Sequence, residues 1–389
     1  MTTPNYELSP VELGGRLRIA RESASITQDA AAKAAGMART TLVSIEKGQR
    51  SARLNEIQAL SRFYGISSNT LLRHEAVHVD LIPRFRSLPE TQGTGMEHAA
   101  KLLNDLVRAE VELENILGIR KPHNYPSEKT ILAGDVRKQA EHDAQTLRNW
   151  LGLGEGPVQN LFAILDLQLG IRIYARNLDS KVSGLFAYDD AIGACILVNA
   201  AHAKDRRTQT GGHELGHFIA TRRQPEIYQD GKHENSREER YANAFGRAFL
   251  TPARSVMQKF NDVTIGSSHL TRRHIILLAN FFGVSRHAMV LRLEELGLTK
   301  KGTWDWFADN GGITNEQVQQ VLGSAAPSPD PIDGTQSSRL FLLAIEAWKK
   351  DLISEGQMSE MLKLDREKVR DLLDEAEEDE IDDLFKLPL

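Results

Sequence analysis

Cysteine is nearly absent from this chain, and several other features are missing altogether. The 389 residues include one cysteine, Cys195, which excludes an intramolecular disulfide and a cysteine-rich zinc finger. No stretch reaches the roughly 18 apolar residues that a membrane span needs. The N-terminus lacks the basic and apolar segments of a secretory signal. These absences exclude secreted disulfide scaffolds and membrane proteins, and they predict a cytoplasmic protein with no membrane partner.

A large excess of charge of one sign is also lacking, since 48 lysines and arginines face 53 acidic residues, for a net charge of −5. The distribution is nevertheless uneven. Residues 13–62 are rich in arginine and lysine, whereas acidic residues crowd into 371–383. The average therefore hides a basic N-terminal module, and an acidic end that we interpret as a solvated tail rather than a DNA mimic or an autoinhibitory segment.

The length corresponds to two or three domains at roughly 150 residues each. Stretches rich in turn-forming residues mark the breaks between them. The expected segments are 12–75, a linker at 83–127 that includes a helix at 96–118, a central domain at 128–300, a helical extension at 301–324, a linker at 325–338 and a helical module with the acidic tail at 339–389. The helix at 96–118 fits either a dimerisation helix or a connector packed on its own chain.

Three short segments, which start at Ala59, Leu277 and Ser359, look alike. Each predicts an apolar helix, a tight turn and a second helix. Their spacing is too irregular for a solenoid, so we interpret them as separate helical corners.

The clearest pattern near the N-terminus is two short helices joined by a glycine turn. Thr27 can cap the first helix, Gly36 supplies the turn, and a second helix is predicted from about Arg39 to Lys47. Such a second helix fits a DNA major groove about 12 Å wide and offers side chains to base edges. Arg39 is placed to pair with a guanine base, and Lys47 is placed to contact backbone phosphates. The residues predicted to contact DNA are Gln28, Arg39, Thr40, Thr41, Ser44, Lys47 and Arg50.

This module resembles the XRE, or lambda-repressor-like, helix-turn-helix family over nearly its whole length, including the IEKGQR stretch after the second helix. The resemblance implies a dimer that binds a palindromic operator of double-stranded DNA. One departure is Ala38, where the family generally has a capping Ser or Thr. The missing cap weakens the second helix by about 0.5–2 kcal/mol. The competing interpretation is a small helical domain that binds protein.

From Pro157 the pattern changes to strands. A predicted helix ends at Gly170, and apolar alternation predicts strands at 171–176, 182–189 and 194–200. We therefore expect a small sheet directly before the segment that carries most of the chemistry.

That segment is a helix, predicted from about Arg206 to Thr221, which contains the sequence HELGH. His213 and His217 are four residues apart on one helical face, so both imidazoles can reach one zinc ion. Glu214 can face the open coordination position, take a proton from zinc-bound water and pass it to a leaving amine. The competing interpretation is an ordinary helix that carries two histidines.

A second helix, predicted from Ser236, offers the third ligand that a zinc site needs. Glu239 and Asn243 lie four residues apart on one face, so Glu239 can bind the metal while Asn243 orients a ligand histidine. Glu238 is the competing ligand, since it lies nearer the apolar face marked by Ala242. The residues themselves leave both alternatives open.

The HELGH helix, followed by ExxAN and an LTP ending, resembles the ImmA/IrrE family of zinc metallopeptidases over about residues 152–297. The resemblance implies a zincin-like fold and one zinc ion per chain, with manganese as an alternative. It also implies Glu239 as the third ligand and Glu214 as the catalytic base. The TGG segment before the first histidine departs from the bulkier residues of the family. The candidates for stabilising an oxyanion are Tyr241, His233 and His269.

Together these patterns predict an α+β chain with an N-terminal all-α helix-turn-helix bundle, a central zincin-like metallopeptidase domain and a helical C-terminal region. Such a fusion resembles regulators of mobile elements and stress responses in which a peptidase cleaves a DNA-bound repressor. The resemblance implies a DNA-binding transcriptional regulator whose zinc endopeptidase cleaves a repressor, either a separate protein or its own helix-turn-helix module. Relief of repression would serve a stress response or the control of mobile elements and phage defence.

The expected partners are operator DNA, a protein substrate, a second copy of the chain in a homodimer, and single-stranded DNA as an activator of conditional activity. The alternative is a non-enzymatic transcription factor or antitoxin, whose peptidase-like domain only senses a ligand or a partner.

Overall fold

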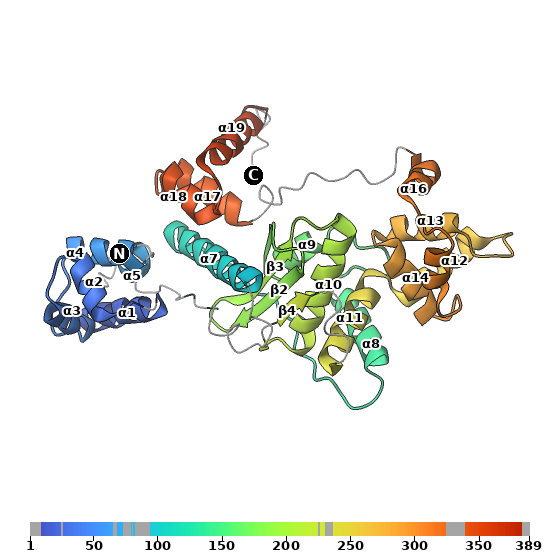
Figure 1. The fold of residues 1–389 in the computed structure, drawn as a ribbon, viewed down its shortest axis with the longest axis horizontal. Coiled ribbons are helices and arrows are strands. Elements are labelled where there is room, and N and C mark those ends of the chain that lie inside the picture. The colour runs from blue at the N-terminus through green and yellow to red at the C-terminus, as the bar shows by residue number, and fades with distance from the viewer. Residues whose placement is uncertain are drawn as a thin grey trace, which may run out of the picture. The chain divides into compact units, whose positions relative to one another are not determined.

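The structure is a computed structural model. It describes residues 9–24, 26–64, 68–72, 79, 81, 94–224, 226–229, 236–323 and 339–382. The chain forms two compact units, of which one comprises Met1–Asp80, Asn104–Lys121 and Arg339–Leu389 and the other comprises Leu81–Leu103 and Pro122–Ser338. Helices dominate the described residues, and their strands form one small sheet, so the α+β class predicted from the sequence is confirmed (Figure 1). The stretches predicted as linkers at 83–94 and 325–338 lie outside the described residues, apart from Thr94.

The N-terminal module contains the predicted helix-turn-helix. Its helices are α1 (Pro10–Ser23), α2 (Gln28–Ala34), α3 (Arg39–Glu46), α4 (Leu54–Tyr64) and α5 (Ser68–Leu72). The Thr27 hydroxyl caps α2 by accepting the Ala30 amide at 3.3 Å, and Gly36 adopts a φ of +65° in the turn that follows. Ala38 precedes α3 without a side-chain cap, so the departure seen in the sequence leaves the first turn of this helix uncapped.

The core of this module fixes α3 to α1. The fully buried apolar side chains include Leu17, Leu42, Ile45 and Leu60. A Cβ at Gly14 would meet the backbone of Ile45 and Glu46, so α1 and α3 cross with their backbones in contact. The buried Arg21 Nε donates to Glu46 Oε1 at 2.6 Å across the same crossing. As a result, α3 is held firmly on one side while its other side faces outward.

The sheet of the second unit has four strands. They are β1 (Arg172–Arg176), β2 (Val182–Asp189), β3 (Gly193–Asn199) and β4 (Glu226–Gln229). Their order is β1-β3-β2-β4, with β1 parallel to β3 and the other neighbours antiparallel. Leu185 and Leu197 lie opposite each other in β2 and β3, and both are fully buried. The first three strands match the predicted ranges to within one residue, whereas β4 was not predicted.

Three helices position the HELGH sequence, and one of them packs on this sheet. They are α8 (Val136–Trp150), α10 (Lys204–Ala220) and α11 (Arg237–Leu250). Helix α10 packs on β2 and β3 on one side and on α11 on the other (Figure 1). Helix α11 lies between α10 and α8. A Cβ at Gly216 would lie 2.7 Å from the Cα of Ala242, and a Cβ at Gly246 would lie 2.7 Å from the backbone of Gly212. Glycines on both helices therefore let α10 and α11 meet backbone to backbone.

The predicted helix that ends at Gly170 is present but irregular. It starts as α9 (Leu161–Ala163) and continues as the π-helical turn η2 (Ile164–Gln168). Gly170 ends it with a φ of +75°. An extra residue in the turn shifts the apolar face, which the spacing of a regular helix does not predict.

The remaining helices of this unit extend the same core. They are α12 (Ala253–Thr264), α13 (Arg272–Phe282), α14 (Arg286–Glu295), α15 (Thr303–Asp309) and α16 (Asn315–Leu322). Phe307 and Ile313, from the segment expected as a helical extension, are buried in the hydrophobic cluster that also contains Leu215 of α10.

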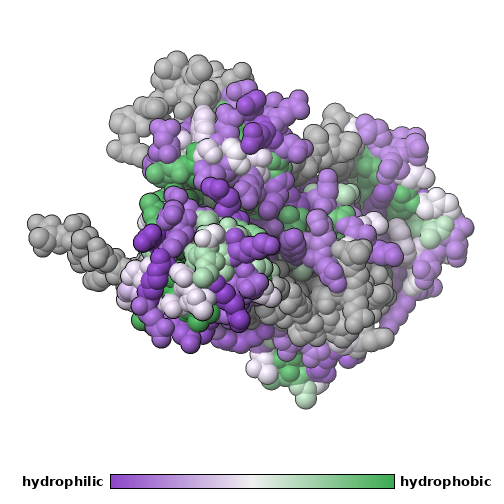
Figure 2. Space-filling model, turned by 60° about the vertical axis from the view of Figure 1, so that its left-hand side comes forward, coloured by the Kyte–Doolittle hydropathy of each residue, from purple (hydrophilic) through white to green (hydrophobic). Residues whose placement is uncertain are grey.

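The face of the molecule that Figure 2 shows has no dominant apolar patch. That face is mostly hydrophilic, and apolar groups form small separate patches. Among the described residues, no single helix has the length and apolar character of a membrane span, and the bent pair α13 and α14 meets that composition only when its two helices are taken together.

The first unit also contains the second half of α7 (Thr94–Leu117) and the C-terminal helices. The latter are α17 (Arg339–Lys349), α18 (Glu355–Leu362) and α19 (Arg366–Asp382). Arg339 forms ion pairs with Glu110 and Glu114 of α7, and Lys363 Nζ lies 3.3 Å from Asp105 Oδ2. Ion pairs thus join α7 to the C-terminal helices of its own chain.

Candidate metal centre and nucleic-acid interface

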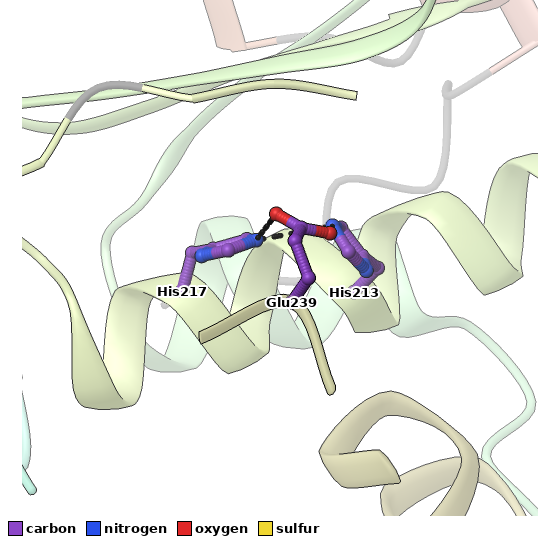
Figure 3. Close-up of side chains that lie close together, drawn as sticks. All are labelled: His213, His217 and Glu239. Atoms are coloured by element: carbon purple, nitrogen blue, oxygen red, sulfur yellow. Dashed lines mark hydrogen bonds and ion pairs between the residues drawn. The ribbon is translucent and has the colours of Figure 1, made fainter. Parts of the chain in front are cut away.

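Three buried side chains from two helices converge between α10 and α11. His213 and His217 project from α10 toward Glu239 of α11 (Figure 3). Their ligand atoms all lie within 4.8 Å of one another, and the three residues are at most 4% exposed. One carboxylate and two imidazoles in a closed cluster are a donor set that holds zinc in catalytic sites.

The distances within the cluster match the size of a zinc site. His213 Nε2 and His217 Nε2 are 3.1 Å apart, while Glu239 oxygens lie 3.1 Å from His217 Nε2 and 3.5 Å from His213 Nε2. Ligands about 2.0–2.1 Å from a tetrahedral ion are separated from one another by roughly 3.3–3.4 Å. The three residues therefore fit a single small cation placed among them.

The far nitrogen of each histidine has its own partner. His213 Nδ1 lies 3.0 Å from Asn243 Oδ1, and His217 Nδ1 lies 3.0 Å from Thr221 Oγ1. An amide oxygen can only accept, so Nδ1 of His213 carries the proton and its Nε2 keeps a lone pair for a metal. The Thr221 hydroxyl also donates to the His217 carbonyl oxygen, which leaves it able to accept from Nδ1. Both rings are thus held with Nε2 toward the centre.

The charge state of His213 suits a ligand. Burial, reinforced by the neighbouring His217, lowers the pKa of His213 to about 3, although Glu239 and Asn243 act in the opposite direction. A neutral imidazole is the form that binds a metal.

Glu214 lies next to the first histidine and is fully buried. The backbone of β2 passes directly over it, since a Cβ at Gly184 would lie 3.0 Å from Glu214 Oε1 and 2.6 Å from the Thr210 side chain. The absence of a side chain at Gly184 therefore lets the strand approach α10 and pack close to the Glu214 carboxylate.

The structure distinguishes Glu238 from Glu239, the two residues that the sequence left open as the third metal ligand. Glu239 is 4% exposed and points to the histidines, whereas Glu238 is exposed. Ser236 caps this helix by accepting the Glu239 amide at 3.0 Å, which fixes the first turn.

Of the residues considered for oxyanion stabilisation, Tyr241 and His269 are described by the structure and are not part of the cluster. The Tyr241 hydroxyl donates to Asp143 Oδ2 of α8 at 2.9 Å, and burial raises its pKa. His269 is exposed in the segment between α12 and α13, and His233 lies outside the described residues. Thr221 and Gly184 were missed in the sequence, although Thr221 repeats the four-residue spacing of the two histidines.

The residues predicted to contact DNA fall into two groups. Arg39, Thr40 and Lys47 are exposed, and Thr41 and Ser44 are partly exposed, along α3 or directly after it. Gln28 and Arg50 instead have partners within the module. Gln28 Nε2 donates to Glu46 Oε2 at 2.8 Å, and Arg50 donates to Glu56 Oε1 at 2.9 Å.

Comparisons with known proteins find matches to two separate parts of the chain. Family models match a helix-turn-helix domain over residues 12–74 and an IrrE N-terminal-like domain, of the M78 peptidases, over residues 167–294. The crystal structure of ComR from Streptococcus suis aligns over 96% of this chain and 96% of its own, with 12% identity and a TM-score of 0.17, which is too low to support any inference. None of the curated proteins compared with the chain matches it.

Fold, site and family matches together define a regulator that has a peptidase-like domain. The chain joins a DNA-binding helix-turn-helix domain to an IrrE-like domain of the M78 peptidases, which is the fusion that the sequence predicted.

Proposed function

We propose that this protein is a DNA-binding transcriptional regulator whose central domain is a zinc-dependent endopeptidase that cleaves a repressor. The observation that carries the proposal is the buried convergence of His213, His217 and Glu239, with both Nε2 atoms toward one point and the buried Glu214 next to His213 in the sequence. Burying three ionisable groups this close together costs free energy, and a cation bound among them would offset that cost.

His213, His217 and Glu239 would hold the zinc ion, with manganese as the alternative. When bound, the ion would act as a Lewis acid and would lower the pKa of a water molecule in its open position. Asn243 and Thr221 keep the two imidazole rings in orientation through their Nδ1 atoms. Glu214 accepts a proton at its carboxylate and then donates it to the leaving amide nitrogen of the cleaved peptide.

The helix-turn-helix domain would bring this activity to an operator. The substrate would be a separate repressor or the helix-turn-helix module of the same protein. Cleavage in the segments at 83–94 or 121–127 would separate DNA-binding heads from a dimer, so operator affinity would fall through loss of bivalency without any change in a base contact. A cytoplasmic location, a homodimer, activation by single-stranded DNA, and a role in stress response or phage defence belong to the same proposal.

Intact-mass spectrometry of the purified full chain tests this function. The protein is incubated with zinc or manganese, with and without single-stranded DNA, beside Glu214→Gln. Fragments cut within 73–130 that appear in the wild type and not in Glu214→Gln would support self-cleavage.

If the chain stays intact, it is next incubated under the same conditions with repressors encoded nearby. If no repressor is cleaved and Glu214→Gln leaves regulation of a reporter unchanged, the protein is instead a non-enzymatic sensor.

A further inference from the structure

The helices α18 and α19 repeat the geometry of the helix-turn-helix formed by α2 and α3. A hydroxyl caps the first helix in each pair, at Thr27 and at Ser354. Nine residues after each cap the chain adopts a left-handed conformation, with a φ of +65° at Gly36 and +55° at Lys363. The second helix begins twelve residues after each cap, at Arg39 and Arg366.

The packing follows the same register. Leu42 of α3 and Val369 of α19 both lie fifteen residues after their caps, and both are 0% exposed. Ile45 and Leu372 both lie eighteen residues after their caps and are at most 5% exposed. The two second helices therefore bury the same face and present the same face outward, so α18 and α19 form a second helix-turn-helix.

The outward faces differ in charge. The positions in α3 and directly after it that face outward hold Arg39, Thr40, Thr41, Ser44 and Lys47. The equivalent positions in α19 hold Arg366, Glu367, Lys368, Asp371 and Asp374. Residues 9–64 contain nine arginines and lysines against five acids, for a net charge of +4, whereas residues 339–382 contain seven against fourteen, for a net charge of −7.

Basic residues near the start of α19 are already paired with acids. Arg370 Nε lies 3.2 Å from Glu355 Oε2, and Lys363 forms its ion pair with Asp105 of α7. Duplex DNA carries one negative charge for about every 1.7 Å of its axis and binds proteins by releasing cations to lysine and arginine. A second helix with a net negative charge is repelled by that surface.

We propose that this second helix-turn-helix docks, through the exposed acidic face of α19, on the DNA-reading face of the N-terminal helix-turn-helix of the same chain. The acidic segment at 371–383, which the composition led us to interpret as a solvated tail, continues α19 as a helix to Asp382, and the proposal gives it an autoinhibitory role instead. The two faces carry opposite charge, and the shared chain raises their effective concentration for each other. Operator DNA then competes with α19 for Arg39 and Lys47, so only the undocked fraction of the protein binds DNA. This inference rests on DNA binding by the N-terminal module and is independent of the metal centre.

Zero-length carbodiimide cross-linking of the full chain tests the contact. The expected product joins the Asp371 or Asp374 carboxylate to the Lys47 ammonium group and disappears when duplex DNA is added. The reaction is run on a mixture of unlabelled and ¹⁵N-labelled protein. Cross-linked peptides with uniform labelling support docking within one chain, whereas mixed labelling would assign the contact to a second copy and overturn the proposal.

DNA affinity gives a second, independent readout. Asp371→Lys combined with Asp374→Lys is compared with Asp309→Lys combined with Glu316→Lys, which reverses two exposed acids on α15 and α16 and changes the net charge equally. On a random-sequence duplex of about 30 base pairs, we expect the α19 variant to bind on the order of tenfold more tightly than its control, as release of a docked state requires. Equal affinities would contradict docking. A loss of affinity in Arg366→Glu as large as that in Arg39→Glu would show instead that α19 contacts DNA.

Discussion

The candidate metal centre and the predicted DNA-reading face are built in opposite ways. His213, His217, Glu214 and Glu239 are buried, and partners on α10 and α11 orient the histidines before any ligand arrives. Arg39 and Lys47 are exposed, so we expect their side chains to take up a defined geometry only against a duplex. The chemistry of the centre is therefore a property of the isolated chain, whereas recognition by α3 is a property of the complex. Substitutions in the centre should change peptide cleavage or zinc affinity, whereas those on α3 should change only DNA binding.

The largest effect is expected for Glu214→Gln. The amide keeps the size of the side chain but cannot take a proton from water, so peptide cleavage should fall by about 10²–10⁴-fold. Turnover of a quenched fluorescent peptide library, or of the repressor substrate, measures the loss.

Zinc content is the control for this variant. It should stay at the wild-type level, because Glu214 is not a ligand. A variant that loses zinc as well would show that Glu214 belongs to the ligand set.

A smaller effect is expected at the two residues that orient the histidines. Asn243→Ala and Thr221→Val each remove a partner of Nδ1, so zinc affinity should fall by roughly 10–100-fold. Competition with a chromogenic chelator measures this affinity without any need for activity.

Thr221→Ser is the matched control, since it keeps the hydroxyl. It should bind zinc nearly as the wild type does. Equal zinc affinities in Thr221→Val and Thr221→Ser would mean that this hydroxyl only caps the end of α10.

On α3, Arg39→Ala should reduce discrimination between operator sequences by about 1–3 kcal/mol, because it removes contacts to a base edge. Lys47→Ala should weaken binding to all duplexes alike and reduce the dependence of affinity on salt. Titrations of each variant with matched and scrambled duplexes at two salt concentrations separate these outcomes. If both variants weaken every duplex equally, Arg39 contacts only phosphate.

The smallest effect is expected for Arg50→Ala. Its guanidinium is paired with Glu56 within the module, so a DNA contact would compete with an existing ion pair. We expect a loss of DNA affinity below about 1 kcal/mol, less than for Lys47→Ala. A larger loss than that of Lys47→Ala would show that Arg50 leaves Glu56 to bind DNA.

The sequence predicted those parts of the fold that periodicity encodes. Helix α10 and strands β1, β2 and β3 come within two residues of the expected ranges, because apolar spacing and turn residues mark them. Strand β4 has only four residues, EIYQ, and its pairing with β2 depends on a partner more than thirty residues away. The π-helical turn at Ile164–Gln168 has the same local composition as a regular helix.

The site shows the same limit. Two histidines four residues apart must share a helical face, but the choice between Glu238 and Glu239 depends on which side of α11 packs on α10. Gly216 against Ala242 and Gly212 against Gly246 decide that side, and this contact is between distant segments. Gln28 was predicted to be available to DNA because Glu46, eighteen residues later, gives no local sign that it holds the amide.

Zinc content of the purified full chain tests the central claim most directly. Wild type, Glu238→Ala and Glu239→Ala are dialysed against zinc, desalted and analysed by mass spectrometry of the metal. We predict about one zinc per chain in the wild type and in Glu238→Ala, and a large loss in Glu239→Ala, because only Glu239 completes the ligand set. A chain that binds no zinc, or a loss in Glu238→Ala with zinc retained in Glu239→Ala, would contradict the account.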